Sequence, residues 1–378
     1  MRDIVILGST GSIGVQALEV IAANPELFRV VGLSAGGNNL TLLAKQVRDF
    51  NVPIVGVSSG AQELKSSLSG VKVIDGSGAS EQIASLTCDL VLNAITGSIG
   101  LAPTLAALAS GNKVALANKE SLVAGGDLVM AYGSEKIIPV DSEHSALFQA
   151  MSAGRVSDVS KLILTASGGP FRDRQDLSKV KLADALAHPT WSMGPVVTIN
   201  SATLVNKGLE IIEAHYLFDI AYSKIEAVIH PQSIVHSLVE FKDGSTLAQA
   251  SPPDMKGPIA YALAYPNRVG GAMAPINWNS KQSWDFEPID EKRFPAVQLA
   301  RRAGALGSSV AAIYNAANEV AVAAFMKEEI AFTAIVDTIE KVVDKLSASA
   351  PSRIRDISDV SAIEQDARIY AREVLEKG

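Results

Sequence analysis

A glycine-rich turn directly after the first apolar run is the feature that most constrains what this chain can fold into. Residues 4–7 are Ile-Val-Ile-Leu, Gly8, Gly11 and Gly14 follow, and a helical pattern then covers residues 15–24. Glycines allow a tight turn, and the next helix offers free N–H groups and the positive end of its dipole to a pyrophosphate. The spacing is GxxGxxG rather than GxGxxG, and a mere packing turn is the alternative. We predict a dinucleotide-binding turn made of Gly8, Ser9, Thr10, Gly11, Ser12 and Ile13.

Short β-rich runs alternate with helical patterns through the first part of the chain. We predict strands at residues 3–7, 30–34, 54–57, 71–74, 90–94, 113–116 and 136–140. Strands separated by helices of this length imply a parallel sheet wound by right-handed crossovers. The predicted fold class is therefore α/β, with a Rossmann-like doubly wound parallel sheet at the N-terminus.

The rest of the chain predicts a central α+β catalytic domain and a small helical domain. Strands are expected at 161–165, 196–200, 227–230 and 238–242, the last in a hairpin with 245–249 across Asp243-Gly244. Helices are expected at 145–151, 203–217, 295–304, 309–327, 332–346 and 363–376. The predicted domains are residues 1–141, 142–265 and 295–378, with a proline- and glycine-rich linker at 266–294.

The end of the second predicted strand bears on the choice of dinucleotide. NAD-binding folds usually place Asp or Glu there, on the ribose 2′-hydroxyl. This chain has Gly36, Gly37, Asn38 and Asn39 instead. The absent carboxylate favours NADP, and the backbone of this loop could hold a phosphate. The string TGSIG recurs at 96–100 after another strand, which is either chance or a second turn facing the same ligand.

Two carboxylates follow the strand expected at 136–140. Asp141 and Glu143 are two residues apart, so both side chains point the same way in an extended segment. Converging carboxylates repel unless a cation or a proton joins them, and oxygen ligands suit Mg²⁺ or Mn²⁺ rather than Zn²⁺. The alternative is a solvated loop.

A second polar cluster lies within residues 200–210. Asn206, Lys207 and Glu210 share one helical turn among apolar neighbours, which suggests the floor of a pocket. Glu210 could be a third metal ligand, while Asn206 and Lys207 could face a phosphate. The alternative is an Asn–Glu pair on a surface helix.

Four other segments carry candidate residues. Ser167 lies in a glycine-rich turn that could present an anion site, and Lys119 follows a strand of the cofactor domain. Trp191, between Pro189 and Gly194, either packs in the core or belongs to a lid. The ring nitrogens of His230 and His236 either support the site or satisfy core hydrogen bonds.

Composition excludes several classes of protein. The chain of 378 residues has a formal net charge of −7 and no run of Lys or Arg, so nucleic acid and anionic membrane surfaces are not expected partners. One cysteine, Cys88, excludes an internal disulfide and a Cys-based metal site. The uncharged run 90–112 contains Asn, Thr, Gly and Pro and is read as strand–loop–helix. With no signal or transit peptide recognised, we expect a cytoplasmic protein.

Taken together, the strings resemble the 1-deoxy-D-xylulose 5-phosphate reductoisomerase family from end to end. They are GSTGSIG (8–14), ANKES (117–121), PVDSEH (139–144), SGGPF (167–171), HPTWSMG (188–194), NSATLVNKGLE (200–210), HPQSIVHS (230–237) and NAANEVAVAAF (315–325). The resemblance implies NADPH- and metal-dependent conversion of 1-deoxy-D-xylulose 5-phosphate to 2-C-methyl-D-erythritol 4-phosphate, in the mevalonate-independent isoprenoid pathway. It also implies a homodimer.

Residue roles follow from the same resemblance. It implies that Asp141, Glu143 and Glu210 bind Mg²⁺ or Mn²⁺, with Lys119 and Ser142 beside the metal and the substrate's oxygens. It places Ser167, Ser201, Asn206 and Lys207 in a phosphate pocket near His188, under a loop with Trp191 and Met193. Asn118, Glu120 and Gly194 are expected to join the glycine turns in binding the cofactor. Some members have a basic residue where this chain has Gly37, which bears on recognition of the 2′-phosphate.

Two rival functions remain open from the residues alone. Another NADP-dependent dehydrogenase would need its own catalytic set, and a semialdehyde dehydrogenase would need a nucleophilic Cys with a nearby His. A non-catalytic cofactor-binding protein would bind NADPH without turnover and without metal dependence. Retro-aldol/aldol cleavage and an α-ketol shift are both compatible with the candidate residues.

Overall fold

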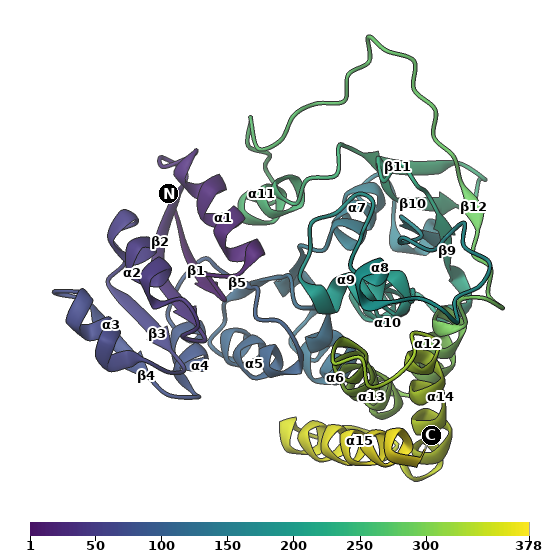
Figure 1. The fold of residues 1–378 in the computed structure, drawn as a ribbon. Helices are drawn as coiled ribbons and strands as arrows, with labels where there is room; N and C mark the ends of the chain where they lie inside the picture. The colour runs from purple at the N-terminus through teal and green to yellow at the C-terminus, as the bar shows by residue number, and fades with distance from the viewer. Residues whose placement is uncertain (378) are drawn as a thin grey trace. The chain divides into compact units, whose positions relative to one another are not determined.

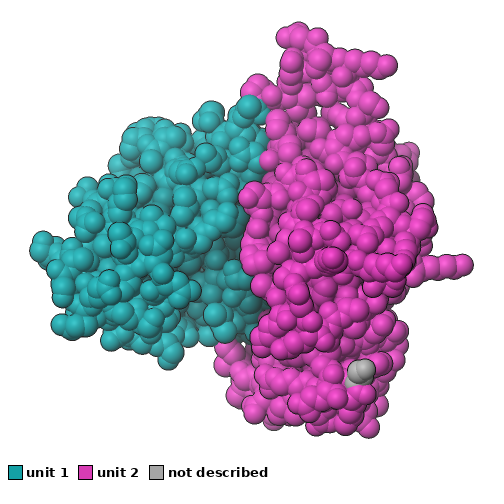
Figure 2. Space-filling model, in the orientation of Figure 1, with its two compact units in different colours: residues 1–121, 129–145, 254–274 teal, residues 122–128, 146–253, 275–378 magenta. Residues whose placement is uncertain are grey.

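The computed structural model describes residues 1–377, which form two compact units. Unit 1 comprises residues 1–121, 129–145 and 254–274, and unit 2 comprises residues 122–128, 146–253 and those from 275 onward (Figure 2). The chain therefore leaves unit 1 and returns to it, whereas the predicted domains 1–141 and 142–265 are contiguous.

Unit 1 is built on one parallel sheet of seven strands (Figure 1). The strands are β1 (Arg2–Leu7), β2 (Phe28–Ala35), β3 (Ile54–Val57), β4 (Lys72–Asp75), β5 (Leu90–Asn93), β6 (Lys113–Leu116) and β7 (Ile137–Pro139). Their order is β4-β3-β2-β1-β5-β6-β7. Helices α1 (Ser12–Ala22), α2 (Leu40–Asp49), α3 (Ala61–Ser67), α4 (Ala79–Ala84) and α5 (Leu101–Ala109) connect successive strands. The predicted Rossmann-like doubly wound sheet is confirmed.

A returning segment completes unit 1. Helix α11 (Lys256–Ala264) packs against α1, and Lys256 forms an ion pair of 2.7 Å with Glu19 on that helix. The guanidinium of Arg2 donates to the carbonyl oxygens of Leu263 (3.1 Å) and Tyr265 (2.8 Å), at the end of α11. The residues that form these contacts are more than 200 positions apart in sequence, so no local sequence pattern indicates them.

Unit 2 contains a mixed five-stranded sheet. Its strands are β8 (Val159–Ala166), β9 (Ile225–Ile229), β10 (Val235–Phe241), β11 (Thr246–Ala250) and β12 (Glu287–Pro288), in the order β11-β10-β8-β9-β12. The predicted hairpin between β10 and β11 is confirmed, and Gly244 in its turn has φ 86°. Helices α6 (Lys119–Met130) and α7 (Ser142–Met151) each begin in unit 1 and continue into unit 2.

One predicted strand is wrong. Residues 196–200 lie in helix α9 (Pro195–Ala202), not in a strand. The run of β-branched residues favours a strand locally. However, Pro195 is preset for the first helical position, and the Thr198 hydroxyl donates to the Gly194 carbonyl oxygen at 3.0 Å. Burial of Thr198 and Ile199 then stabilises the helix against local propensity.

Helices make up the C-terminal region, as predicted. They are α12 (Ala296–Ala305), α13 (Ser308–Met326), α14 (Ala334–Leu346) and α15 (Ile357–Lys377), and α13 packs against both α14 and α15. Helix α10 (Val205–Phe218) packs against α12, and the short helix α8 (Leu182–Ala185) precedes α9. By length and composition α13 could cross a membrane, but 78% of its apolar window is buried inside the structure, as is typical of a core helix.

Candidate active site

The first glycine turn lies at the point where the strand order of unit 1 reverses. The chain runs outward from β1 to β4 and then resumes at β5, on the other side of β1. In such sheets, ligands bind in the crevice at the carboxyl ends of the two strands. Gly8 follows β1 with φ 75°, and a Cβ there would lie 2.7 Å from the carbonyl oxygen of Ala94, just after β5. Glycine is required for this close approach.

The first turn of α1 is suited to an anion. Its N-cap, Gly11, makes no side-chain cap, and Gly11 and Ser12 are exposed while Thr10 and Ile13 are half-buried. Ser9 differs from its neighbours because it is fully buried: its hydroxyl donates to the Gln46 side-chain oxygen at 2.9 Å, and the Gln46 amide donates to the Ser9 carbonyl oxygen at 2.8 Å. The side chain of Ser9 therefore braces the turn from inside. Gln46 was not among the predicted site residues.

The loop after β2 carries no carboxylate. Gly36 and Asn38 are exposed, and Gly37 has φ 109° and fits against the Ser59 backbone, where a Cβ would lie 2.5 Å from the Ser59 carbonyl oxygen. Asn39 caps α2 by accepting from the Leu42 N–H at 3.0 Å. A loop of this composition neither bonds a ribose 2′-hydroxyl with an acidic group nor repels a 2′-phosphate.

Asn118 and Glu120 flank the start of α6. The buried Asn118 amide donates to the carbonyl oxygens of Ile95 and Gly97 (2.8 Å for Gly97) and to Glu120 Oε2 at 3.1 Å. Asn118 Oδ1 accepts from the Ser121 N–H at 2.8 Å, which caps the helix. Asn118 thus fixes the loop after β5 that contains the second TGSIG string.

Acidic and basic groups gather after β6 and β7 in unit 1. Lys119 Nζ lies 2.6 Å from Asp141 Oδ2, and both side chains are largely shielded from solvent. Ser142 Oγ donates to Glu143 Oε2 at 2.5 Å, at the start of α7. The ring of His144 is fully buried, with Nδ1 3.9 Å from Asp141 Oδ2. His144 stands in the PVDSEH string but was not predicted as a site residue.

The first turns of α10 carry a second acidic centre, in unit 2. Glu210 is fully buried; Asn206 Nδ2 donates to its Oε1 and Lys207 Nζ donates to its Oε2. Lys207 is itself 3% exposed, so this is a buried ion pair. The predicted cluster of amide, ammonium and carboxylate is therefore present, and it is not a surface helix pair.

Gly208 allows α10 to pack closely against helices α12 and α13. A Cβ at this position would lie 2.6 Å from Ala300 Cβ on α12 and 3.0 Å from the Tyr314 hydroxyl on α13. Glycine therefore permits close packing of α10 against these helices. This close packing fixes the position of α10, whose first turns carry Asn206, Lys207 and Glu210.

Ser167, His188 and Ser201 converge in unit 2. His188 Nε2 lies 3.0 Å from Ser167 Oγ and 3.1 Å from Ser201 Oγ. His188 Nδ1 accepts from the backbone N–H groups of Thr190 (3.1 Å) and Trp191 (2.9 Å). Because Nδ1 is an acceptor, a neutral ring carries its proton on Nε2 and donates toward the serines. Burial lowers the pKa of His188, which favours this neutral form.

The loop that follows His188 is only partly covered. Trp191 and Met193 are half-buried, and Gly194 is exposed at the start of α9. The Trp191 ring lies 6.1 Å, centroid to centroid, from that of His236. A half-buried Trp fits a loop over a site better than a core-packing role.

His230 and His236 form core hydrogen bonds. His230 Nδ1 lies 2.8 Å from the Asp285 carbonyl oxygen, and Nε2 accepts from the N–H groups of Ile234 and Val235, both at 3.1 Å. His236 Nε2 lies 3.1 Å from the Ser251 carbonyl oxygen. The sequence left two alternatives for these rings, support of the site or core hydrogen bonding. For His230 the structure supports core hydrogen bonding.

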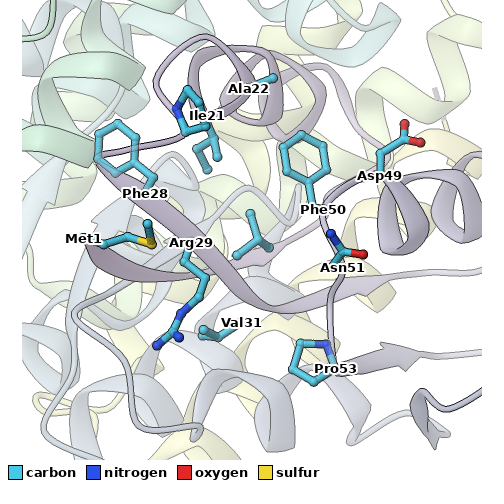
Figure 3. A pocket seen from close by; sticks show the side chains of 12 residues that line it. Met1, Ile21, Ala22, Phe28, Arg29, Val31, Asp49, Phe50, Asn51 and Pro53 are labelled. Atoms are coloured by element: carbon cyan, nitrogen blue, oxygen red, sulfur yellow. The ribbon is translucent and has the colours of Figure 1, made fainter.

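A cavity of about 940 Å³ lies in unit 1, and none of its lining residues is a candidate site residue (Figure 3). It is lined by the starts of β1 and β2 and the ends of α1 and α2, including Met1, Phe28 and Phe50. This is the amino-terminal edge of the parallel sheet, opposite the edge where nucleotides bind. The cavity is therefore not the predicted cofactor site.

These features define a class of protein. A doubly wound sheet with a glycine turn at its switch point is typical of dinucleotide-dependent enzymes. Unit 2 adds hydroxyl, imidazole, amide and ammonium groups of the kinds that bind phosphate. Asp141 and Glu143 in unit 1 and Glu210 in unit 2 are carboxylates of the kind that bind a hard cation.

Comparisons with known proteins specify the class further. Models of 1-deoxy-D-xylulose 5-phosphate reductoisomerase match residues 4–126, and models of its C-terminal domains match 137–218 and 250–370. The enzyme of this name from Kitasatospora griseola is 53% identical over 98% of this chain and 99% of its own length, and that from Mycobacterium marinum is 55% identical over 94% and 89%. The Zymomonas mobilis reductoisomerase in complex with NADPH superposes with a TM-score of 0.93 at 39% identity, covering 99% of each chain.

The chain belongs to the 1-deoxy-D-xylulose 5-phosphate reductoisomerase family. It is an oxidoreductase and isomerase that converts 1-deoxy-D-xylulose 5-phosphate to 2-C-methyl-D-erythritol 4-phosphate.

Proposed function

We propose that the glycine turn, the three carboxylates and the unit 2 pocket together carry out this conversion. NADPH binds at the turn after β1, a divalent cation at Asp141, Glu143 and Glu210, and the substrate phosphate at Ser167, Ser201, Asn206 and Lys207 with His188. The observation that carries the proposal is on helix α10. There Lys207, whose ammonium group can bind a phosphate, and Glu210, whose carboxylate can bind a cation, share one helical turn. A related reductoisomerase in complex with NADPH, fosmidomycin and magnesium covers 100% of this chain, with a TM-score of 0.92 at 35% identity.

The donor set fits a hard cation. Asp141 and Glu143 in unit 1 and Glu210 in unit 2 all offer oxygen ligands only. Such ligands suit Mg²⁺ and Mn²⁺, with waters or substrate oxygens completing the coordination. Each of the three carboxylates is already polarised by a neighbouring donor: Lys119 on Asp141, Ser142 on Glu143, and Lys207 on Glu210.

The chain's own residues bind, orient and shield the substrate. The serines, Asn206 and Lys207 hold the phosphate, and this remote binding energy orients the reacting end. The loop with Trp191 and Met193 closes over the substrate and excludes water. The Lys119 ammonium, beside Asp141, can donate a proton to a developing alkoxide. When bound, NADPH supplies the hydride and the cation supplies Lewis-acid polarisation. Both retro-aldol/aldol cleavage and an α-ketol shift suit this arrangement.

We further propose that the enzyme is a cytoplasmic homodimer that accepts Mn²⁺ as well as Mg²⁺. The family resemblance supports the dimer, and the single cysteine supports a reducing compartment. The oxygen-only ligand set discriminates weakly between the two cations.

The test is NADPH oxidation by purified protein with 1-deoxy-D-xylulose 5-phosphate, in Mg²⁺, in Mn²⁺ and in EDTA. We expect oxidation with either cation, none in EDTA, and 2-C-methyl-D-erythritol 4-phosphate as the product. Folded protein that binds NADPH but oxidises none with either cation would contradict the proposal and favour a cofactor-binding protein.

A further inference from the structure

Lys207 and Glu210 form a buried ion pair with each other, although the proposed function assigns each of them to a different ligand. The Lys207 ammonium is assigned to the phosphate, and the Glu210 carboxylate is assigned to the cation. In the structure they are bonded to each other, and Asn206 takes the second oxygen of Glu210. Both side chains of the ion pair are almost fully buried.

Breaking such a pair on one side only is unfavourable. A buried charge that loses its partner is left uncompensated in a medium where water cannot solvate it. A cation that takes Glu210 therefore leaves the ammonium of Lys207 in need of an anion. Conversely, a phosphate that takes Lys207 leaves the carboxylate of Glu210 in need of a cation.

The residues proposed to bind the phosphate lie in unit 2, and some of them lie only a few residues before this pair. A Cβ at Gly169 would lie 3.0 Å from the carbonyl oxygen of Ser201, so the turn containing Ser167 abuts the end of α9. The chain then turns through Leu204, with φ 59°, directly into the first turn of α10, which bears Lys207. The Gly169 N–H donates to Ser167 Oγ at 3.2 Å and the imidazole of His188 bridges both serines, so this site is already organised.

We propose that Lys207 couples the two ligands by exchange: the phosphate group draws its ammonium from Glu210, and this exposes the carboxylate to the divalent cation. The inference rests on the proposed function, which places the phosphate and the cation at these residues. Each ligand then raises the affinity for the other, since coupling between two binding sites is reciprocal. A cation alone must compete with Lys207, which protects the empty site from occupation by metal without substrate.

The first measurement is Mn²⁺ affinity of the metal-free protein, followed by the electron paramagnetic resonance signal of free Mn²⁺. Methylphosphonate serves as the probe because it has the anionic group but no arm that reaches the cation, and a titration without protein corrects for their direct association. We expect saturating methylphosphonate to raise Mn²⁺ affinity by about 5- to 150-fold. Ser167→Ala should weaken methylphosphonate binding yet keep this ratio at saturation.

The second measurement separates exchange from simple charge repulsion. Glu210→Gln keeps the shape of the side chain but releases Lys207, so methylphosphonate affinity in EDTA, measured by calorimetry, should rise several-fold. Glu213→Gln removes a second buried carboxyl group from the same helix and leaves both Lys207 and Glu210 in place. It should leave that affinity within about twofold, because the ammonium remains on Glu210.

The outcomes distinguish this inference from the proposed function. Equal Mn²⁺ affinity with and without saturating methylphosphonate would overturn the exchange alone. An equal gain in methylphosphonate affinity in both glutamine variants would also overturn it, in favour of plain repulsion. Mn²⁺ binding that survives unchanged in Glu210→Gln would overturn the metal assignment as well.

Discussion

His188 has separate partners on the two nitrogens of its ring. Nδ1 accepts from two N–H groups of the following loop, and Nε2 faces Ser167 and Ser201. One side chain therefore connects the loop that carries Trp191 to the proposed phosphate pocket. A residue with this position can order the loop when the pocket is filled.

Two substitutions at His188 separate these contacts. In His188→Asn, the amide oxygen reaches the position of Nδ1, so the loop contacts persist while the contact to the serines is lost. In His188→Gln, the terminal amide reaches toward Nε2, so the reverse holds. We expect Asn to raise the KM for substrate about tenfold with the loop still resistant to limited proteolysis, and Gln to make the loop cleavable. Identical behaviour of the two variants would contradict the two-sided role.

Stability should depend on pH through the same ring. Burial lowers the pKa of His188 below its ordinary value of 6.5, so the unfolded chain binds the proton more readily. The stability that neutral His188 contributes is therefore present above about pH 6.5 and is lost as the pH falls through the lower folded pKa. Urea unfolding at several pH values should show a weaker acid destabilisation in His188→Asn. An unchanged pH profile would contradict this.

At the scale of elements, the sequence pattern predicts those helices and strands whose conformation depends mainly on neighbouring residues. The strands of unit 1 are short apolar runs between turn residues, and their predicted bounds agree closely with β1 to β7. Residues 196–200 were predicted wrongly because packing and a proline at the first helical position outweigh the strand propensity of β-branched residues. The spacing of Asn206, Lys207 and Glu210 on one helix was readable from sequence. The bonds of Ser9 to Gln46 and of Arg2 to α11 join distant segments, so no local signal could reveal them.

The first glycine turn gives a test of cofactor binding. Alanine at Gly14 would place a Cβ 2.5 Å from both the Gly8 carbonyl oxygen and Ser9 Cα, so the turn must open. We expect Gly14→Ala to weaken NADPH binding about tenfold or more, or ~1.4 kcal/mol. Gly11→Ala, whose nearest contact would be 3.3 Å, should cost less in the same fluorescence titration. Equal affinity of Gly14→Ala and the wild type would contradict this role of the turn.

The seating of α10 gives a test of packing. Gly208→Ala would drive a Cβ to 2.6 Å from Ala300 Cβ, and overpacking of this kind costs about 1–3 kcal/mol of unfolding free energy. Gly270→Ala is the matched control, because nothing lies within 4 Å of its Cβ position. Denaturant unfolding of both variants measures the difference. A Gly208→Ala protein as stable as the control would mean that the helices adjust freely.

At the scale of the whole molecule, the chemistry is divided among segments far apart in sequence. The proposed cofactor turn, Asp141 and Glu143 belong to unit 1, whereas the proposed phosphate-binding residues and Glu210 belong to unit 2. The fold class and the candidate residues could be predicted from sequence, because each motif is a short local string. The bonds that organise them, such as those of His188 and Gln46, depend on the folded chain.

The central claim is that Asp141, Glu143 and Glu210 serve one cation in one reaction. The most direct measurement is NADPH oxidation with 1-deoxy-D-xylulose 5-phosphate by Asp141→Asn, Glu143→Gln and Glu210→Gln, each with its NADPH affinity measured. Glu340→Gln, which removes an exposed carboxylate on α14, is the control. We predict a loss of at least about 100-fold in kcat/KM for each of the three, with NADPH affinity unchanged, and less than about tenfold for the control. Metal-dependent activity within about tenfold of wild type in any of the three would contradict the claim.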